Sequence, residues 1–373
     1  MKIKTLIVFA LIIVSCQTKQ EKKENAKKSI VEQSLDKNAD LLLLDSTINA
    51  ISIGVYHKSK TYIKHYGELD KGKGNKPTDE TIYEIASVSK TFAGTLVAQA
   101  ELEGKLNLED NIQKYLKKPF PNFEYNGNPI KIKHLITHTS RLPRFLPDII
   151  NKIVENPTND LAFKIHRAEN NYSKEKFFSD LALVNLDTIP GTKEGYSSVD
   201  TELIAHILEN IYGKSYEELI QKKICQKLAM THTGTVLKEN AKHKLANGYL
   251  ENNVLAPKMI SQLWGAGGGM TSTLPDLMKY IKFQLNSKDE VAKKSHQILY
   301  QNGNYKIGYY WPIGFDQDLG TYYSHQGGAF GIQNYMFVFP EENLGISVII
   351  NQNIKGTSNK LLKVVHGILE DLK

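Results

Sequence analysis

Strand patterns lie at the two ends of the chain, and this separation is the feature that most restricts the fold. Apolar residues alternate along 51–55, and a polar turn separates this run from a second β-rich run at 62–66. Near the other end, the β-rich runs 335–339 and 346–350 flank a turn that contains proline and glycine. These patterns predict two hairpins. We therefore expect one sheet that is assembled from both ends of the chain.

The residues between the hairpins carry the apolar spacing of helices. Gly104 and Gly213 follow two such segments, where glycine often ends a helix. A further segment after the second hairpin has one apolar face, which indicates a helix that covers the sheet. The predicted helices are 92–103, 201–212, 216–228, 274–285 and 358–372.

This order of elements predicts an α+β fold, with an antiparallel sheet flanked by helices and a mostly helical second region. We place the folded domain at 41–372, with its α/β part at about 41–83 and 290–372 and its helical part at about 84–289. The chain of 373 residues is 41% hydrophobic and contains 19 Tyr and 13 Phe, enough to form a large core. A mainly disordered chain is excluded, because such chains lack apolar side chains.

The N-terminus has the pattern of an export signal. Lys2 and Lys4 precede an apolar run at 6–14, which is too short for a membrane-spanning helix. The following Cys16 completes a sequence, IVSC, that resembles the bacterial lipobox. We predict a signal peptide at 1–15 and, at 16–40, a lipidated Cys16 with a flexible tether, which together place the protein in the cell envelope. An ordinary secretory signal with a chance cysteine is the alternative.

The second cysteine and the charge distribution limit what else the chain can bind. If Cys16 is lipidated, Cys225 has no partner for a disulfide, and its apolar surroundings favour a place in the core. The net charge is +7, but residues 1–28 hold seven Lys and two Glu, which leaves +2 for the rest. Nucleic-acid binding is therefore not expected, since it needs basic residues clustered on the folded part. The oligomeric state stays open.

A serine three residues before a lysine is the first candidate for chemistry. On a helix the two side chains face the same side, so a lysine amine can take the serine proton. The spacing occurs at Ser34, Ser87 and Ser173, so it has little weight by itself. Only Ser87, with Lys90, opens an apolar helix that a core could bury. Ser173 is expected to be a helix N-cap.

Five segments, in order, resemble one family. The chain is similar to the penicillin-recognising serine hydrolases, which comprise class C β-lactamases, D,D-peptidases and family VIII esterases. The resemblance covers roughly residues 45–370. The segments are IASVSKT at 85–91, IKHLITHTSRLP at 132–143, PGTKEGYSS at 190–198, GAGGGMTST at 265–273 and HQGG at 325–328.

The resemblance implies the roles of the candidate residues. Ser87 is the nucleophile, Lys90 its proton acceptor, and Tyr196 the second base that protonates the leaving group. A phenol needs nearby positive charge to act as a base, and Lys90 supplies one. The backbone N–H groups of Ser87 and Gly328 would form the oxyanion hole. No cofactor is implied, and the reaction is acyl transfer through an acyl-enzyme.

Three positions depart from the family pattern. Ser198 stands where an asparagine is usual, so a hydroxyl replaces a carboxamide beside the substrate. His325, which opens the third motif with Gly327, stands where β-lactamases carry lysine. Its neutral imidazole pairs less well with a substrate carboxylate than an ammonium does. Arg141 replaces a turn glycine, which matters only where the backbone needs positive φ.

These departures favour an exported esterase or D,D-peptidase that acts on an ester or a D-amino-acid peptide. A β-lactamase proper, or a non-catalytic peptide-binding envelope lipoprotein of the same fold, remains the alternative. Other constellations are weaker. His134 and His138 could face together as metal ligands, but no glutamate stands between them, and we expect no metal. The glycines at 265–269 lack the lysine that ends a phosphate-binding loop.

Overall fold

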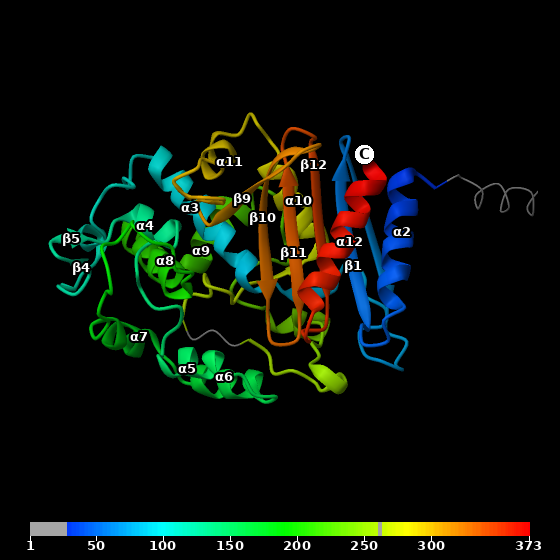
Figure 1. The fold of residues 1–373 in the computed structure, drawn as a ribbon, viewed down its shortest axis with the longest axis horizontal. Coiled ribbons are helices and arrows are strands. Elements are labelled where there is room, and N and C mark those ends of the chain that lie inside the picture. The colour runs from blue at the N-terminus through cyan, green and yellow to red at the C-terminus, as the bar shows by residue number, and fades with distance from the viewer. Residues whose placement is uncertain (1–27, 260–262) are drawn as a thin grey trace, which may run out of the picture.

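The computed structural model describes residues 28–259 and 263–373. Its main feature is an eight-stranded antiparallel sheet in the order β2-β1-β12-β11-β10-β9-β8-β7. The N-terminal hairpin of β2 and β1 therefore joins the C-terminal strands through β1, which pairs with β12, as the hairpin patterns predicted (Figure 1). The strands are β1 Ala50–His57, β2 Lys60–Gly67, β7 Tyr300–Asn302, β8 Tyr305–Gly308, β9 Trp311–Asp316, β10 Gly320–Gly328, β11 Gln333–Phe339 and β12 Leu344–Ile350.

Helices cover both faces of the sheet. On one face lie α2 and α12, which bury alternate residues of β1 and β12 in a core of their own. On the other face α10 packs against β1, β11 and β12, although it belongs to the predicted helical part of the chain. The helices of eight or more residues are α2 Ile30–Leu43, α3 Ser89–Leu102, α6 Leu161–Glu169, α7 Lys174–Leu181, α8 Ser198–Tyr212, α10 Leu274–Gln284 and α12 Thr357–Leu372.

A second, larger core joins α3, α8 and α10 to the helical region beside the sheet. Of the shorter helices α4, α5, α9 and α11, α4 and α9 contribute residues to this core, α11 packs against α3, and α5 lies beside α6 (Figure 1). Their bounds are Ile132–Ile136, Ile149–Glu155, Tyr216–Ile220 and Glu290–Ser295, and the π-helical turn Gln221–Cys225 extends α9. The predicted α+β fold is thus confirmed, and Cys225 is buried in the large core. Among the described helices, none is long and apolar enough to cross a membrane.

The prediction of a flexible tether over 16–40 is wrong for its last part. Ile30–Leu43 forms helix α2, which begins with a capping box between Ser29 and Glu32. Four of its apolar residues recur every three or four positions and are buried, whereas the mostly polar residues between them lower the average hydrophobicity of the segment. The buried apolar side chains are Val31, Leu35, Ala39 and Leu42. Cys16 and the signal peptide lie outside the described residues.

Helix α2 is attached to the C-terminal end of α12 by polar contacts. Ser34 Oγ donates to Asp371 at 2.8 Å, and Lys37 Nζ lies 2.6 Å from the same carboxylate. One residue beyond α12, Lys373 Nζ lies 2.6 Å from Asp318 in the turn before β10. These contacts place the start of α2, the end of α12 and the start of β10 at one end of the sheet.

Candidate active site

Ser87 lies in a tight turn that leads into α3. The short strand β3, Ile82–Glu84, pairs with β6, Thr271–Thr273, and the chain then enters the 3₁₀ turn Ala86–Val88. Ala86 has a φ of 45°, a left-handed conformation that is uncommon for a residue with a side chain. This backbone places Ser87 immediately before the first turn of α3, as the sequence predicted.

Lys90 is fully buried one helical turn after Ser87. Its Nζ lies 3.3 Å from Ser87 Oγ and 3.2 Å from Ser198 Oγ, and it also donates to the carbonyl oxygen of Gly267. Three oxygens therefore lie within hydrogen-bond distance of the amine, which has three N–H groups when it is protonated. Ser198, the residue that replaces the usual asparagine, thus takes part in holding Lys90.

Tyr196 approaches Ser87 from the loop that precedes α8. Its hydroxyl oxygen lies 2.8 Å from Ser87 Oγ, and Lys90 Nζ lies 4.9 Å from the centre of its ring. The side chain is 40% exposed, so one side of the ring faces solvent. Ser87 Oγ is thereby within hydrogen-bond distance of both candidate bases, as the resemblance implied.

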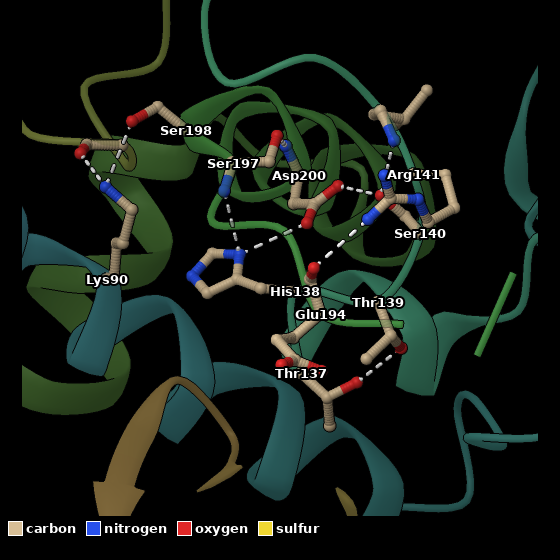
Figure 2. A network of polar contacts seen from close by, with 12 residues as sticks. Lys90, Thr137, His138, Thr139, Ser140, Arg141, Glu194, Ser197, Ser198 and Asp200 are labelled. Carbon is tan, nitrogen blue, oxygen red and sulfur yellow. Dashed lines mark hydrogen bonds and ion pairs between the residues drawn. The ribbon is translucent and has the colours of Figure 1, made fainter. Parts of the chain in front are cut away.

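His138 and Asp200 contact each other in a network beside the loop that carries Tyr196, a feature that the sequence analysis missed (Figure 2). The carbonyl oxygen of His138 accepts from Gly195 N–H at 2.7 Å. The imidazole Nδ1 of His138 lies 3.3 Å from the backbone nitrogen of Ser197. The two rings of His138 and Tyr196 are 4.6 Å apart. His138 therefore contacts the chain on both sides of Tyr196 as well as the ring itself.

Asp200 completes this buried network. Its carboxylate lies 3.1 Å from His138 Nδ1 and accepts a hydrogen bond from Ser140 Oγ. Burial raises the pKa of Asp200 well above its ordinary value and lowers the pKa of His138 well below its own. Both pKa shifts favour the uncharged form of the side chain, so the buried network beside Tyr196 is neutral. Its only sequence signal is an acidic residue in the first turn of α8.

His134 and His138 do not act together. His134 Nδ1 accepts from the backbone of Lys131 at 3.2 Å, within its own helix, whereas His138 faces Asp200. Burial lowers the pKa of His134 to about 4. In the part of the chain that the structure describes, no group of three His, Cys, Asp or Glu residues could hold a metal ion.

The third motif lies at the end of β10, against the turn that carries Ser87. A Cβ atom on Gly327 would lie 2.2 Å from the backbone oxygen of Ile85, so only glycine allows this approach. Asn334 Nδ2 bridges the two segments, donating to Ile85 O at 3.2 Å and to Gly327 O at 3.1 Å. Gly328, the last residue of the strand, is therefore held near Ser87.

His325 is buried and has a defined tautomer. Its Nδ1 lies 2.8 Å from the carbonyl oxygen of Gln326, and a carbonyl oxygen can only accept, so Nδ1 carries a proton. In the neutral ring, Nε2 then presents a lone pair. Burial, with the nearby charge of Lys90, lowers the pKa of His325 to about 3. The neutral side chain cannot donate to a substrate carboxylate.

Arg141 occupies a position that does need positive φ, with a value of 69°. Its side chain offsets the strain by pairing with both oxygens of Asp187, at 2.8 and 2.7 Å, and with the backbone oxygen of Glu194 at 3.1 Å. The substitution of the usual glycine therefore joins two loops next to Tyr196.

Known proteins resemble this chain over most of its length. Protein flp of Staphylococcus aureus (strain N315) is 30% identical over 341 residues, which are 86% of this chain but 63% of the length of flp. The D-alanyl-D-alanine-carboxypeptidase/endopeptidase AmpH of Escherichia coli (strain K12) is 25% identical over 343 residues, 86% of this chain and 83% of AmpH.

Two solved structures share the fold. A class C beta-lactamase superposes with a TM-score of 0.78 at 21% identity, covering 94% of this chain and 98% of that chain. The beta-lactamase/D-alanine carboxypeptidase of Yersinia pestis, complexed with citrate, gives a TM-score of 0.74 at 22% identity, covering 91% and 99%. The family model named Beta-lactamase matches residues 30–366. The chain belongs to the beta-lactamase family.

Proposed function

We propose that this protein is an exported serine hydrolase that forms an acyl-enzyme on an ester or a D-amino-acid peptide. The observation that carries the proposal is the position of Ser87 Oγ, 3.3 Å from Lys90 Nζ and 2.8 Å from the hydroxyl oxygen of Tyr196. A serine becomes a strong nucleophile when an adjacent base can take its proton.

The contacts of Lys90 suit a proton acceptor. As a neutral amine, Lys90 can donate its two N–H groups to Gly267 O and Ser198 Oγ and direct its lone pair at the Ser87 hydroxyl. Ser87 Oγ then bonds to the substrate carbonyl carbon while its proton passes to Lys90. Tyr196 protonates the leaving group as the acyl bond breaks, and water later releases the acyl group.

The backbone N–H groups of Ser87 and Gly328 are proposed to stabilise the oxyanion. Both belong to segments that are fixed in place, because Asn334 bridges Gly327 to the turn before Ser87. Fixed amide donors require no reorganisation when charge develops on the carbonyl oxygen.

The third motif supports esters over β-lactams as substrates. A lysine there could donate to the carboxylate of a penicillin, whereas the neutral His325 cannot. AmpH is by name a D-alanyl-D-alanine carboxypeptidase and endopeptidase, which supports a D-peptide substrate. A β-lactamase proper is the second candidate, and the beta-lactamase fold is what favours it.

Chemical labelling tests the proposed nucleophile. A fluorophosphonate probe should add one adduct to the wild type by intact mass, and Ser87→Ala should abolish it. Ser173→Ala is a matched control, because Ser173 also precedes a lysine by three residues but caps α7. Labelling that survives in Ser87→Ala would disprove the assignment, whereas a wild type that takes up no label would favour the alternative of a non-catalytic binding lipoprotein.

Substrate preference is tested by comparing kcat/KM for a 4-nitrophenyl ester, a D-alanyl-D-alanine peptide and nitrocefin. The wild type should hydrolyse the ester or the peptide faster than nitrocefin. His325→Lys should shift this preference toward nitrocefin, which carries a carboxylate. Faster hydrolysis of nitrocefin by the wild type would instead identify a β-lactamase.

The envelope location is proposed from the sequence around Cys16. Labelling cells with a fatty-acid analogue should mark the wild type, and Cys16→Ser should remove the label. Two acyl chains on this cysteine would hold the protein stably on a membrane. A wild type that is never labelled would leave a secreted protein as the better description.

A further inference from the structure

We propose that Arg144 binds a carboxylate of the substrate, which would make it a specificity-determining residue next to the catalytic group. The inference rests on the serine hydrolase function proposed above and extends it to the class of substrate. It starts from the finding that His325 has no hydrogen to offer a carboxylate, because its Nδ1 proton is directed at Gln326 O.

The backbone of Arg144 is fixed directly beside the catalytic loop. Its carbonyl oxygen accepts from Ser198 N–H at 2.9 Å, and the preceding Pro143 carbonyl accepts from Ser197 Oγ at 2.7 Å. On the other side, the amide group of Asn151 accepts from Phe145 N–H at 3.1 Å and donates to Phe145 O at 2.9 Å. The Arg144 backbone is therefore held between two anchors.

Arg144 is exposed, although its backbone carbonyl is held by the N–H group of Ser198. Its guanidinium carbon lies 5.8 Å from the centre of the Tyr196 ring and 5.1 Å from that of Phe145. The hydroxyl of the same Tyr196 lies 2.8 Å from Ser87 Oγ. A substrate bound at Ser87 that extends past Tyr196 therefore reaches this guanidinium.

A groove of about 790 Å³ runs along this side of Tyr196 and includes Arg144 in its lining. Within the described residues, the Arg144 side chain has no ion pair or hydrogen bond, whereas the other charged side chains of the groove have partners. These pairs are Arg141–Asp187, Lys152–Asp148 and Tyr172–Asp180. Among the described residues that line this groove, Arg144 is thus the cation that remains available to a ligand.

A guanidinium is well suited to this role, since its planar N–H groups can bind both oxygens of a carboxylate. The other basic side chain of the site, Lys90, is buried and already surrounded by three oxygens. The carboxylate could belong to the acyl part of the substrate or to its leaving group. Both sources present the same chemistry to Arg144, and the two arms of the experiment separate them.

The first arm places the carboxylate on the acyl group. The selectivity ratio is kcat/KM for 4-nitrophenyl hemisuccinate divided by kcat/KM for 4-nitrophenyl butyrate. Arg144→Gln should lower this ratio about tenfold or more, because a charge-assisted hydrogen bond is lost. Arg144→Lys should retain part of it. Arg167→Gln, which removes an exposed arginine from α6, is the matched control and should keep the wild-type ratio.

The second arm places the carboxylate on the leaving group. It compares cleavage of diacetyl-L-lysyl-D-alanyl-D-alanine with cleavage of the corresponding peptide amide, followed by mass spectrometry of their common product. The acid-to-amide ratio should fall by a similar factor in Arg144→Gln if this carboxylate is the one recognised. A fall in either ratio supports the inference, and unchanged ratios in both arms overturn it.

Binding to Ser87→Ala keeps the inference testable without turnover. Calorimetry should give tighter binding of the peptide acid or of succinate to Ser87→Ala than to the double variant with Arg144→Gln. If the wild type hydrolyses none of the substrates but this difference remains, the proposed function fails while Arg144 is still the carboxylate site. If hydrolysis is normal and neither ratio nor affinity depends on Arg144, the inference alone fails.

Discussion

Replacing His325 with glutamine should remove part of the protein's sensitivity to acid. The imidazole is 5% exposed, and burial lowers its pKa from 6.5 to about 3. As the pH falls below 6.5, the unfolded chain binds a proton at this position that the folded protein does not bind. Stability is therefore lost below pH 6.5, and the loss continues until the pH reaches the folded pKa.

The size of this effect follows from the shift in pKa. Each pH unit between the two pKa values costs about 1.4 kcal/mol. Between pH 7 and pH 4.5 the linkage relation gives about 2.5 kcal/mol of lost stability from His325 alone. Glutamine does not titrate, so His325→Gln should lose about 2.5 kcal/mol less than the wild type over the same interval.

Urea unfolding of both proteins at pH 7 and pH 4.5 measures this difference directly. Other titrating groups are present in both proteins, so their contributions cancel in the comparison. The free energy of unfolding of the two proteins should converge or cross as the pH falls. Parallel pH dependences would refute a buried neutral imidazole, as would a titration of His325 near pH 6.5 by nuclear magnetic resonance.

Three further predictions concern other features. In His138→Asn the new side chain tolerates the positive φ of 55°, but the ring beside Tyr196 is lost. The acylation rate should therefore fall at least about tenfold in a stopped-flow ester assay. An unchanged rate would show that Tyr196 needs no such support. Leu35→Ala should cost about 2–5 kcal/mol in urea unfolding, and the exposed Leu41→Ala about 0.5 kcal/mol or less. Equal costs would mean that α2 contributes little to the folded domain. Burial raises the pKa of the Cys225 thiol to about 12, so Ellman's reagent should label it only after denaturation. Labelling of the native protein would contradict that burial.

The sequence predicted those parts of the fold that depend on local pattern. Alternation at 51–55 and 346–350 indicated strands, and the structure pairs them directly in β1 and β12. Helix α2 was missed because the prediction relied on the composition of 17–38. Its apolar face became meaningful only with α12, which lies more than 300 residues away in the chain.

The candidate site was predicted unevenly for a similar reason. Ser87, Lys90 and Tyr196 belong to recognisable segments, and the structure brings their side chains together. The His138–Asp200 contact joins residues that are 62 apart in the chain, and no spacing rule links them. Likewise, the tautomer of His325 depends on a carbonyl oxygen whose direction only the folded backbone defines.

The position of α2 determines where a lipid on Cys16 would be joined to the folded domain. The start of α2 lies at the end of the sheet where β10 begins, because α12 contacts both. Ser87 lies at the other end of β10, beside Gly327 and roughly 27 Å away at about 3.4 Å per residue. A lipid on Cys16 would thus join the folded domain at the end of the sheet remote from Ser87, and the anchor would not have to pass the side on which substrate reaches that serine.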